Sequence, residues 1–282
     1  MNSIPPLRSN ALTPQIGEEV VGIDLSLPLA ATTVHALRSL LGARGMLFLR
    51  RQQLTPEAQL NFAASFGEII VNPYFANVPG HPAVAQVLKE ANQRQNIGEK
   101  WHTDNSYDAC PALGSVLYAK EVPVCGGDTL FASMYAAYDS LSDGLKGALS
   151  GLKAVHSTRH VFSDKGYHGT RDTKGRILTD TQEHREAVHP LVITHPISGL
   201  KALFVNPGLT THIEGWTPEE SAGLLQFLYE HAQRPEFQCR LRWEAGTIAI
   251  WDNRCTWHKA LNDYHGHRRL MHRVQIEGVA LH

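Results

Sequence analysis

Two side chains that bind metals stand two residues apart near the middle of the chain, His102 and Asp104. On a strand or a strand-like turn, residues at this spacing project to the same side, so one short segment can supply two neighbouring ligands. Iron(II) enzymes that activate oxygen commonly bind the metal through two histidines and one carboxylate on one face, which leaves the opposite face open. The segment therefore offers two of the three side chains that such a site needs.

The His-x-Asp pattern is weak evidence by itself. Sixteen histidines and 11 aspartates in 282 residues produce about 0.6 such tripeptides by chance. A surface histidine beside a turn aspartate explains the pattern as well, so support has to come from other segments.

A second block of interest lies near the C-terminus, where residues 251–254 (WDNR) are followed by His258. Further on, residues 269–276 predict a strand, on which Arg269 and Arg273 share a face. Burying two arginines is costly unless anions meet them. A dicarboxylate co-substrate is suitable, because the guanidinium fork matches a carboxylate. A pair of structural salt bridges is the alternative.

Taken together, the His-x-Asp tripeptide, the segment 126–129 (GGDT), the WDNR block with its histidine, and the pair of arginines resemble one family. This is the taurine dioxygenase/TfdA family of Fe(II)- and 2-oxoglutarate-dependent dioxygenases. The resemblance extends from about Leu12 to Gly278. It implies a mainly β fold, with a double-stranded β-helix (jelly-roll) core and flanking helices. It also implies a homo-oligomer, either a dimer or a tetramer.

The resemblance assigns roles by position. His102, Asp104 and His258 become the iron ligands and the catalytic centre. Thr129 and Arg269 would hold the distal carboxylate of 2-oxoglutarate, and Arg273 would meet an acidic group of the primary substrate. The implied reaction consumes O2, converts 2-oxoglutarate to succinate and CO2, and hydroxylates a substrate C–H bond.

The substrate is less well defined. Where taurine-oxidising members carry His, Tyr and Asn, a gap-free alignment places Asn72, Phe75 and Gly98 in this chain. We therefore expect these three residues to bind a small organic anion with a more apolar body, of the aryloxyalkanoate, alkyl sulfate or sulfonate type. Taurine/alkanesulfonate dioxygenase activity proper is the alternative, and core or loop packing is the alternative role of the three residues.

Two other protein classes fit parts of the pattern. A non-enzymatic cupin-like binding protein shares the β architecture but has no need of Arg269 and Arg273. A zinc hydrolase also uses three protein ligands and an open position, so the ligand set does not exclude it. The motifs G-x-S-x-G, H-E-x-x-H and G-x-G-x-x-G are absent from the sequence.

Helices and strands must position these residues. Thr55 and Thr217 each precede proline and glutamate, which predicts helix starts at both points. The apolar spacing predicts a helix over 32–45, and Ser133 and Ser142 can each begin another. Strands are expected at 17–26, 46–49, 83–88, 115–118, 188–195, 202–206, 237–243, 247–252 and 269–276.

Composition narrows the class further. A net charge of −1 and a pI near 7.0 give no electrostatic footprint for nucleic acid or an anionic membrane. No apolar run reaches the length of a membrane span, and the four cysteines have no C-x-x-C spacing. We expect a cytoplasmic protein with free thiols and one domain over 1–282. The polar stretch at 163–187 predicts a mobile lid, with a plain surface loop as the alternative.

Overall fold

The computed structural model describes residues 7–72, 74–159 and 184–282. Five α-helices lie in these ranges: α1 Ala31–Arg44, α2 Pro56–Ala64, α3 Met134–Asp139, α4 Asp143–Leu149 and α5 Pro218–Ala232. Their ends follow local chemistry: the Thr55 hydroxyl accepts a hydrogen bond from the backbone of Ala58, and Thr217 with Glu220 forms a complete capping box. The predicted helix starts are confirmed.

The strands outnumber the helices. They are β1 Arg8–Ala11, β2 Glu18–Val21, β3 Met46–Leu49, β4 Ile69–Ile70, β5 Asn77–Val78, β6 His81–Lys89, β7 Gly114–Glu121, β8 Thr129–Ser133, β9 Lys153–Ser157, β10 Glu186–Pro190, β11 Val192–Thr194, β12 Lys201–Leu203, β13 Thr210–Ile213, β14 Gln238–Leu241, β15 Ile248–Asp252, β16 Thr256–Ala260 and β17 Arg269–Ile276. The fold is therefore mainly β, as expected.

Two sheets enclose the core that matters for the site. The large sheet has the order β1-β2-β3-β15-β7-β17-β6-β5, with β4 beside β17, and the small sheet has the order β14-β8-β16. Their inner faces share one apolar cluster, to which the large sheet contributes Phe48, Leu117 and Met271 and the small sheet contributes Phe131 and Leu241. Two facing sheets, antiparallel except for the parallel pair β2 and β3, surround a common core and form the predicted jelly roll.

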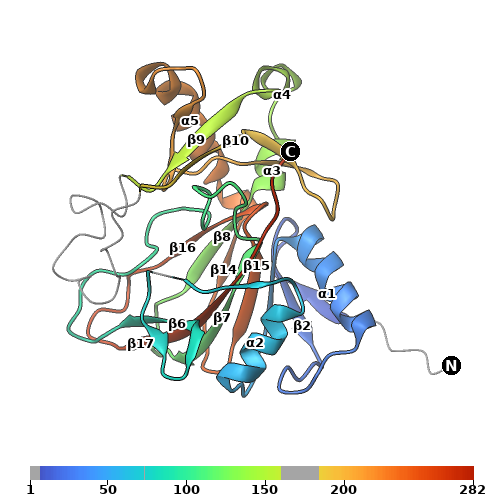
Figure 1. The fold of residues 1–282 in the computed structure, drawn as a ribbon, viewed down its shortest axis with the longest axis vertical. Coiled ribbons are helices and arrows are strands. Elements are labelled where there is room, and N and C mark those ends of the chain that lie inside the picture. Colours follow the sequence, from blue (N-terminus) through green and yellow to red (C-terminus); the bar gives the residue numbers. More distant parts are fainter. Residues whose placement is uncertain (1–6, 73, 160–183) are drawn as a thin grey trace.

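Helices pack on the outside of the two-sheet core (Figure 1). Helices α1 and α2 lie against the outer face of the large sheet, where Leu37 and Phe62 pack on Val116 and Val274. In a second part of the structure, around Trp257 and Leu228, helix α3 packs on β12, and helix α5 packs on β13 and α3. The helices thus leave the inner faces of the two sheets to the site.

Strand β17 carries both arginines of interest. It runs over the predicted residues, Arg269–Ile276, between β6 and β7. Met271 belongs to the core between the sheets, whereas Val274 and Ile276 pack under the helices. Since side chains alternate along a strand, Arg269 and Arg273 share the inner face with Met271.

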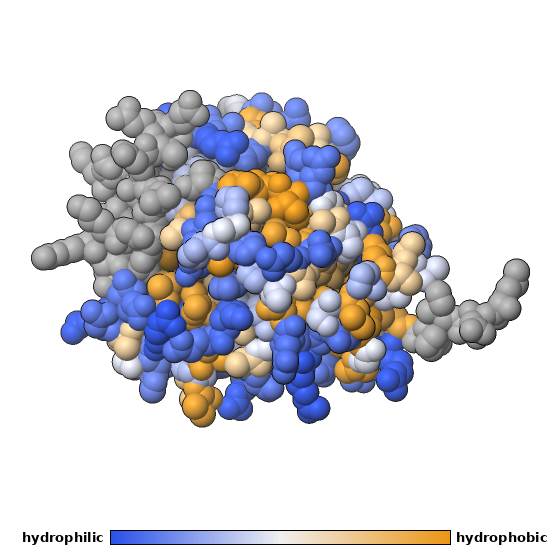
Figure 2. All heavy atoms as spheres, turned by 60° about the horizontal axis from the view of Figure 1, so that its bottom comes forward, coloured by the Kyte–Doolittle hydropathy of each residue, from blue (hydrophilic) through white to orange (hydrophobic). Residues whose placement is uncertain are grey.

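The surface has several separated apolar patches among hydrophilic side chains (Figure 2). No described helix has both the length and the apolar character needed to cross a bilayer. All four cysteines are free, which confirms that expectation; Cys110 and Cys125 are exposed and the other two are buried. Most of the predicted lid, 163–183, lies outside the described residues, and its last residues begin β10.

Candidate active site

His102 and His258 are brought together by a short backbone bridge between distant segments. His102 donates its backbone N–H to the carbonyl of His258 at 3.2 Å, and His258 donates to that of His102 at 2.9 Å. The hydroxyl of Thr103 also donates to the carbonyl of Thr256 at 2.9 Å. The loop before β7 is therefore fixed to β16, and the two imidazole rings lie 4.1 Å apart between their centroids.

Asp104 completes the cluster. Its Oδ1 atom lies 3.7 Å from Nε2 of His102 and 3.7 Å from Nε2 of His258. The next residue, Asn105, has φ of 54°, a left-handed conformation that asparagine tolerates better than most residues. The turn this creates aims the carboxylate at the two rings. One ligand atom from each side chain lies within 4.8 Å of the others.

The two imidazoles are set up as neutral ligands. Burial lowers the pKa of His102, and burial followed by the neighbouring His102 lowers the pKa of His258 well below its usual value. Nδ1 of His102 lies 2.7 Å from the carbonyl oxygen of Lys100. Because a carbonyl can only accept, Nδ1 carries the proton and Nε2 keeps its lone pair. His102 is thus oriented as metal-binding histidines usually are.

Asp104 is held ionised. Burial opposes its ionisation, but Arg273, followed by the two histidines and the hydroxyl of Ser115, holds the pKa of Asp104 well below its usual range. Arg273 lies 2.6 Å from Oδ2 of this carboxylate. A carboxylate and two neutral imidazoles on one side form a donor set that suits Fe(II). The side chain of His102 keeps 21% of its surface exposed, so the cluster opens to solvent on that side.

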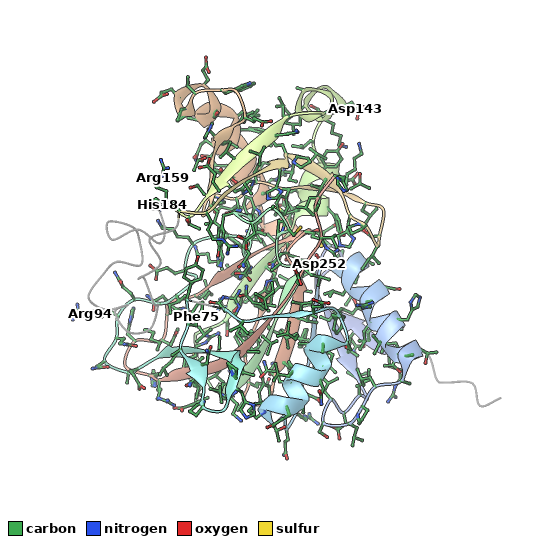
Figure 3. All side chains as sticks on the ribbon, in the orientation of Figure 1. Phe75, Arg94, Asp143, Arg159, His184 and Asp252 are labelled. Atoms are coloured by element: carbon green, nitrogen blue, oxygen red, sulfur yellow. The ribbon has the colours of Figure 1, made fainter. Side chains whose placement is uncertain are left out.

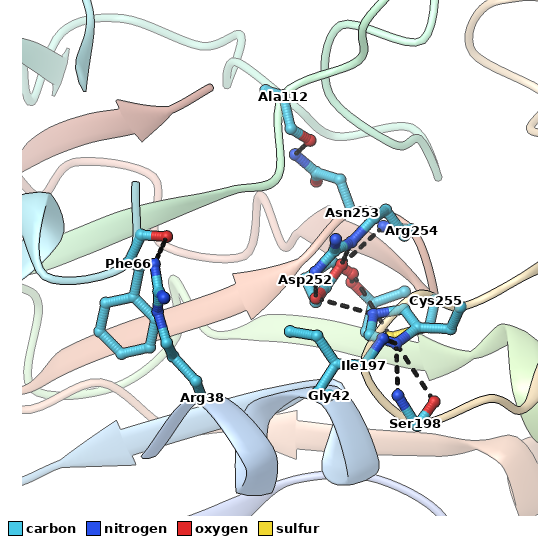
Figure 4. Close-up of polar contacts among 12 residues, drawn as sticks. Arg38, Gly42, Phe66, Ala112, Ile197, Ser198, Asp252, Asn253, Arg254 and Cys255 are labelled. Carbon is cyan, nitrogen blue, oxygen red and sulfur yellow. Dashed lines mark hydrogen bonds and ion pairs between the residues drawn. The ribbon is translucent and has the colours of Figure 1, made fainter. Parts of the chain in front are cut away.

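A second cluster of possible ligands has a structural role. His195, Asp252 and Cys255 are fully buried, and the Asp252 carboxylate is already occupied. It accepts hydrogen bonds from Arg254 at 2.6 and 2.8 Å and lies 3.0 Å from Nε2 of His195. Figure 4 shows Arg254 against Asp252 on the turn after β15. These contacts lock the WDNR turn that leads into β16 and His258.

Arg269 is buried and forms no ion pair with any described residue. It is 3% exposed, and its Nε atom has no hydrogen-bond partner. Its guanidinium carbon lies 5.9 Å from the centroid of Trp243, whose indole N–H donates to the hydroxyl of Thr129 at 2.9 Å. Burial lowers the pKa of Arg269. Because no residue in the described part of the chain forms an ion pair with Arg269, its guanidinium can still bind a carboxylate at this end of the site.

Arg273 faces an apolar cluster. Its guanidinium carbon lies 5.8 Å from the centroid of Phe75, and Phe75 packs with Tyr74, Tyr107 and Leu209. Phe75 is buried, and its position is labelled in Figure 3. The arginine is therefore a cation at the edge of an apolar wall, next to the metal-ligand candidate Asp104.

The remaining predicted residues lie nearby in different roles. Asn72 is buried, its amide donates to Gln275, and its oxygen accepts from the backbone of Tyr74 at 2.8 Å. Gly98 has φ of 79°, and a Cβ added there would lie 3.2 Å from Cε1 of His102. Gly98 thus leaves space for the ring of His102, and Asn72 fixes the chain before Phe75.

Comparison with known proteins identifies the family. The family model described as taurine catabolism dioxygenase TauD, TfdA family, matches residues 8–275. The chain belongs to the TauD/TfdA family. It is 34% identical over 268 residues to an alpha-ketoglutarate-dependent sulfate ester dioxygenase of Pseudomonas putida, covering 94% of this chain and 87% of that one. It is 33% identical over 276 residues to the alpha-ketoglutarate-dependent 2,4-dichlorophenoxyacetate dioxygenase of Cupriavidus pinatubonensis, covering 89% and 91%.

Comparison with a solved structure supports the same family assignment. The crystal structure of a taurine dioxygenase from Burkholderia xenovorans has a TM-score of 0.82 and 34% identity, covering 98% of this chain and 91% of that chain. The jelly-roll fold is therefore that of the TauD/TfdA family. The chain is an oxidoreductase of the 2-oxoglutarate (alpha-ketoglutarate)-dependent dioxygenase class, and its cofactor and co-substrates are Fe(II), 2-oxoglutarate and O2.

Sequence reasoning missed two residues at the site, Ser115 and Trp243. Ser115 donates to Oδ2 of Asp104 and accepts from Arg273, while Trp243 lies between Thr129 and Arg269. The alternation of β7 was the available signal for Ser115, since it places this serine on the same face as the core residue Leu117.

Proposed function

We propose that this TauD/TfdA-family enzyme hydroxylates a C–H bond of a small organic anion with an apolar body. His102, Asp104 and His258 would hold Fe(II). The observation that carries the proposal is the combination of three converging metal-ligand atoms with Arg269, a buried arginine that forms no ion pair with any described residue and whose Nε has no hydrogen-bond partner. The metal and 2-oxoglutarate supply the oxidising power, and the protein supplies geometry, orientation and a dry pocket.

Arg269 and Thr129 would bind the distal carboxylate of 2-oxoglutarate. The unpartnered Nε of Arg269 is a donor that the folded chain leaves for a ligand. Thr129 accepts its hydrogen bond from Trp243, so its own O–H is free to donate to a carboxylate oxygen. Trp243 would then hold both groups in place, through the hydrogen bond to Thr129 and the ring contact with Arg269.

Arg273 would attract the anionic group of the primary substrate, and Phe75 would contact its apolar body. Both residues lie together at the cluster that contains Tyr74, Tyr107 and Leu209. The relatives are named for sulfate ester and 2,4-dichlorophenoxyacetate substrates, which combine an anion with an apolar part. We therefore favour alkyl sulfates and aryloxyalkanoates over taurine, whose body carries an amino group.

The other two predicted substrate residues act indirectly in this proposal. Asn72 is bonded to Gln275, which lies two residues from Arg273 on the same strand, so it supports that wall of the pocket. Gly98 keeps the space beside His102 open. Direct contact of either residue with substrate stays a prediction.

The experiment is succinate release by the Fe(II)-loaded enzyme with 2-oxoglutarate, tested against alkyl sulfates, aryloxyacetates, alkanesulfonates and taurine. We expect release above the substrate-free rate with at least one of the first two classes, and little with taurine. An enzyme most active on taurine would refute the substrate assignment. Hydrolysis of a sulfate ester without O2 or 2-oxoglutarate would favour the zinc hydrolase.

Two further predictions concern the whole protein. We propose a homo-oligomer, dimer or tetramer, which light scattering after size-exclusion chromatography measures directly. We also propose a cytoplasmic location, in keeping with the four free cysteines.

The alternative of a cupin-like binding protein without redox chemistry is less favoured, because it would not explain the buried Arg269, whose Nε has no hydrogen-bond partner.

A further inference from the structure

Ser115 occupies a special place on the inner face of β7. It is fully buried, and it lies opposite Trp251 on β15 and Gln275 on β17. Its hydroxyl donates to Oδ2 of Asp104 at 3.1 Å and accepts from Nε and Nη2 of Arg273 at 3.1 and 3.0 Å. A serine hydroxyl has one donor and two acceptor sites. All three are used, and all three go to the metal-ligand candidate or to the substrate-binding candidate.

The hydroxyl divides the Asp104 carboxylate into two unlike oxygens. Oδ2 receives Ser115 and Arg273, whereas Oδ1 faces Nε2 of both histidines at 3.7 Å. Hydrogen bonds to a carboxylate fix its orientation, and those from charged donors are the strongest. Only Oδ1 therefore remains in position to bind a metal between the two imidazoles.

The same hydroxyl restricts Arg273. A guanidinium has five N–H donors. Nε and Nη2 are bonded to Ser115 and Asp104, and no described residue accepts a hydrogen bond from Nη1. Nη1 is the end that Arg273 can offer to an incoming anion, beside the ring of Phe75.

We propose that Ser115 is a positioning residue that couples the metal site to the substrate site. It holds Oδ2 of Asp104 away from the metal, so that the carboxylate binds through Oδ1 and leaves the open positions free. It also fixes Arg273 so that the anion of the substrate meets Nη1. The inference rests on the proposed function, because it assigns Asp104 to the metal and Arg273 to the substrate.

Ser115→Ala removes the hydroxyl and keeps every charge. Mutation of a residue that hydrogen-bonds to a metal ligand typically lowers the affinity for the metal by about 10- to 100-fold. We expect Mn(II) affinity, measured by calorimetry, to fall about tenfold. We also expect the visible absorption of the Co(II)-loaded protein to change, because Oδ2 of Asp104 then loses one of its two donors and the other, Arg273, loses its own bonds to Ser115. Ser115→Thr retains a hydroxyl on a strand and should bind Mn(II) within about twofold of wild type.

Ser221→Ala is the matched control. Ser221 is also fully buried, and among the described residues its hydroxyl bonds only to the backbone of Ile213 and Thr217. This variant should leave Mn(II) affinity and the Co(II) spectrum unchanged. Should Ser115→Ala fail to fold, Ser115→Cys fills the same volume with a weaker donor and takes the same test.

The outcomes separate the two proposals. Wild-type protein that binds no Mn(II) would overturn the proposed function, and the role of Ser115 with it. Wild-type binding with an unchanged affinity and Co(II) spectrum in Ser115→Ala, or in Ser115→Cys if that variant is used, would overturn the role of Ser115 alone. A loss of affinity equal to that in Ser221→Ala would also overturn it, because the effect would then be general destabilisation.

Discussion

Replacing Arg269 should abolish the binding of 2-oxoglutarate without lowering the stability of the ligand-free protein. The guanidinium is 3% exposed and its Nε lacks a partner, which costs the folded protein about 1–3 kcal/mol. Arg269→Met removes this cost and also removes the contact with Trp243, which contributes about 1 kcal/mol. The balance predicts that the ligand-free variant is as stable as wild type or up to about 2 kcal/mol more stable.

Binding of 2-oxoglutarate should depend on the same residue. A ligand at 100 times its dissociation constant stabilises the folded state by about 2.7 kcal/mol. At about 2 °C per kcal/mol, wild-type protein loaded with Mn(II) should gain about 5 °C in melting temperature. Arg269→Met should gain almost nothing at the same concentration, because the carboxylate loses its cation.

Arg268→Met is the matched control for this measurement. Arg268 immediately precedes β17 in the sequence, is about a third exposed, and pairs with Glu90 and Glu121 at the surface. Its replacement should cost less than about 1 kcal/mol and should leave the 2-oxoglutarate shift intact. The reasoning is refuted if Arg269→Met keeps the full shift, or if it loses 2 kcal/mol or more without ligand.

Three further changes test other parts of the structure. Burial, followed by His189, lowers the pKa of His156 to about 3, so the folded state keeps this ring neutral and loses stability as the pH falls from about 6.5 toward 3. Between pH 7 and pH 5, the free energy of unfolding in urea should fall by about 2 kcal/mol more for wild type than for His156→Gln. Equal losses in the two proteins would contradict this role of His156. Asp252→Asn leaves the buried Arg254 without its partner and should cost about 3–5 kcal/mol in the same assay, and a loss below 1 kcal/mol would exclude the structural role. Gly98→Ala places a methyl group against His102 at a φ of 79° and should weaken Mn(II) binding, which calorimetry would contradict if the affinity were unchanged.

Much of the architecture could be predicted because its signals are local. The capping box at Thr217 and the strand over 269–276 agree with the structure. Strands β8 and β16 were missed, because Thr129–Ser133 reads as a corner after two glycines and Thr256–Ala260 mixes aromatic and charged residues without alternation. Both strands belong to the small sheet, whose pairing joins segments more than 100 residues apart. No local pattern specifies such pairing.

Some residues of the candidate site could likewise be predicted from the sequence, and others could not. The resemblance named His102, Asp104 and His258, and the structure brings their ligand atoms together. The contact of Arg273 with Asp104 could not be predicted, because a long side chain can reach several partners from one strand position. Ser115 was missed for a related reason: a serine in an apolar strand looks like small filler until its partners are known.

The most direct test of the central assignment is an absorption measurement without oxygen. Wild-type protein given Fe(II) and 2-oxoglutarate should develop a weak metal-to-ligand charge-transfer band in the visible range, because the co-substrate would chelate an iron that we propose His102, Asp104 and His258 hold. The band should be lost in His102→Ala and retained in His212→Ala, a control in which a partly buried histidine on β13 is changed. Absence of the band in wild type, or an unchanged band in His102→Ala, would contradict the account.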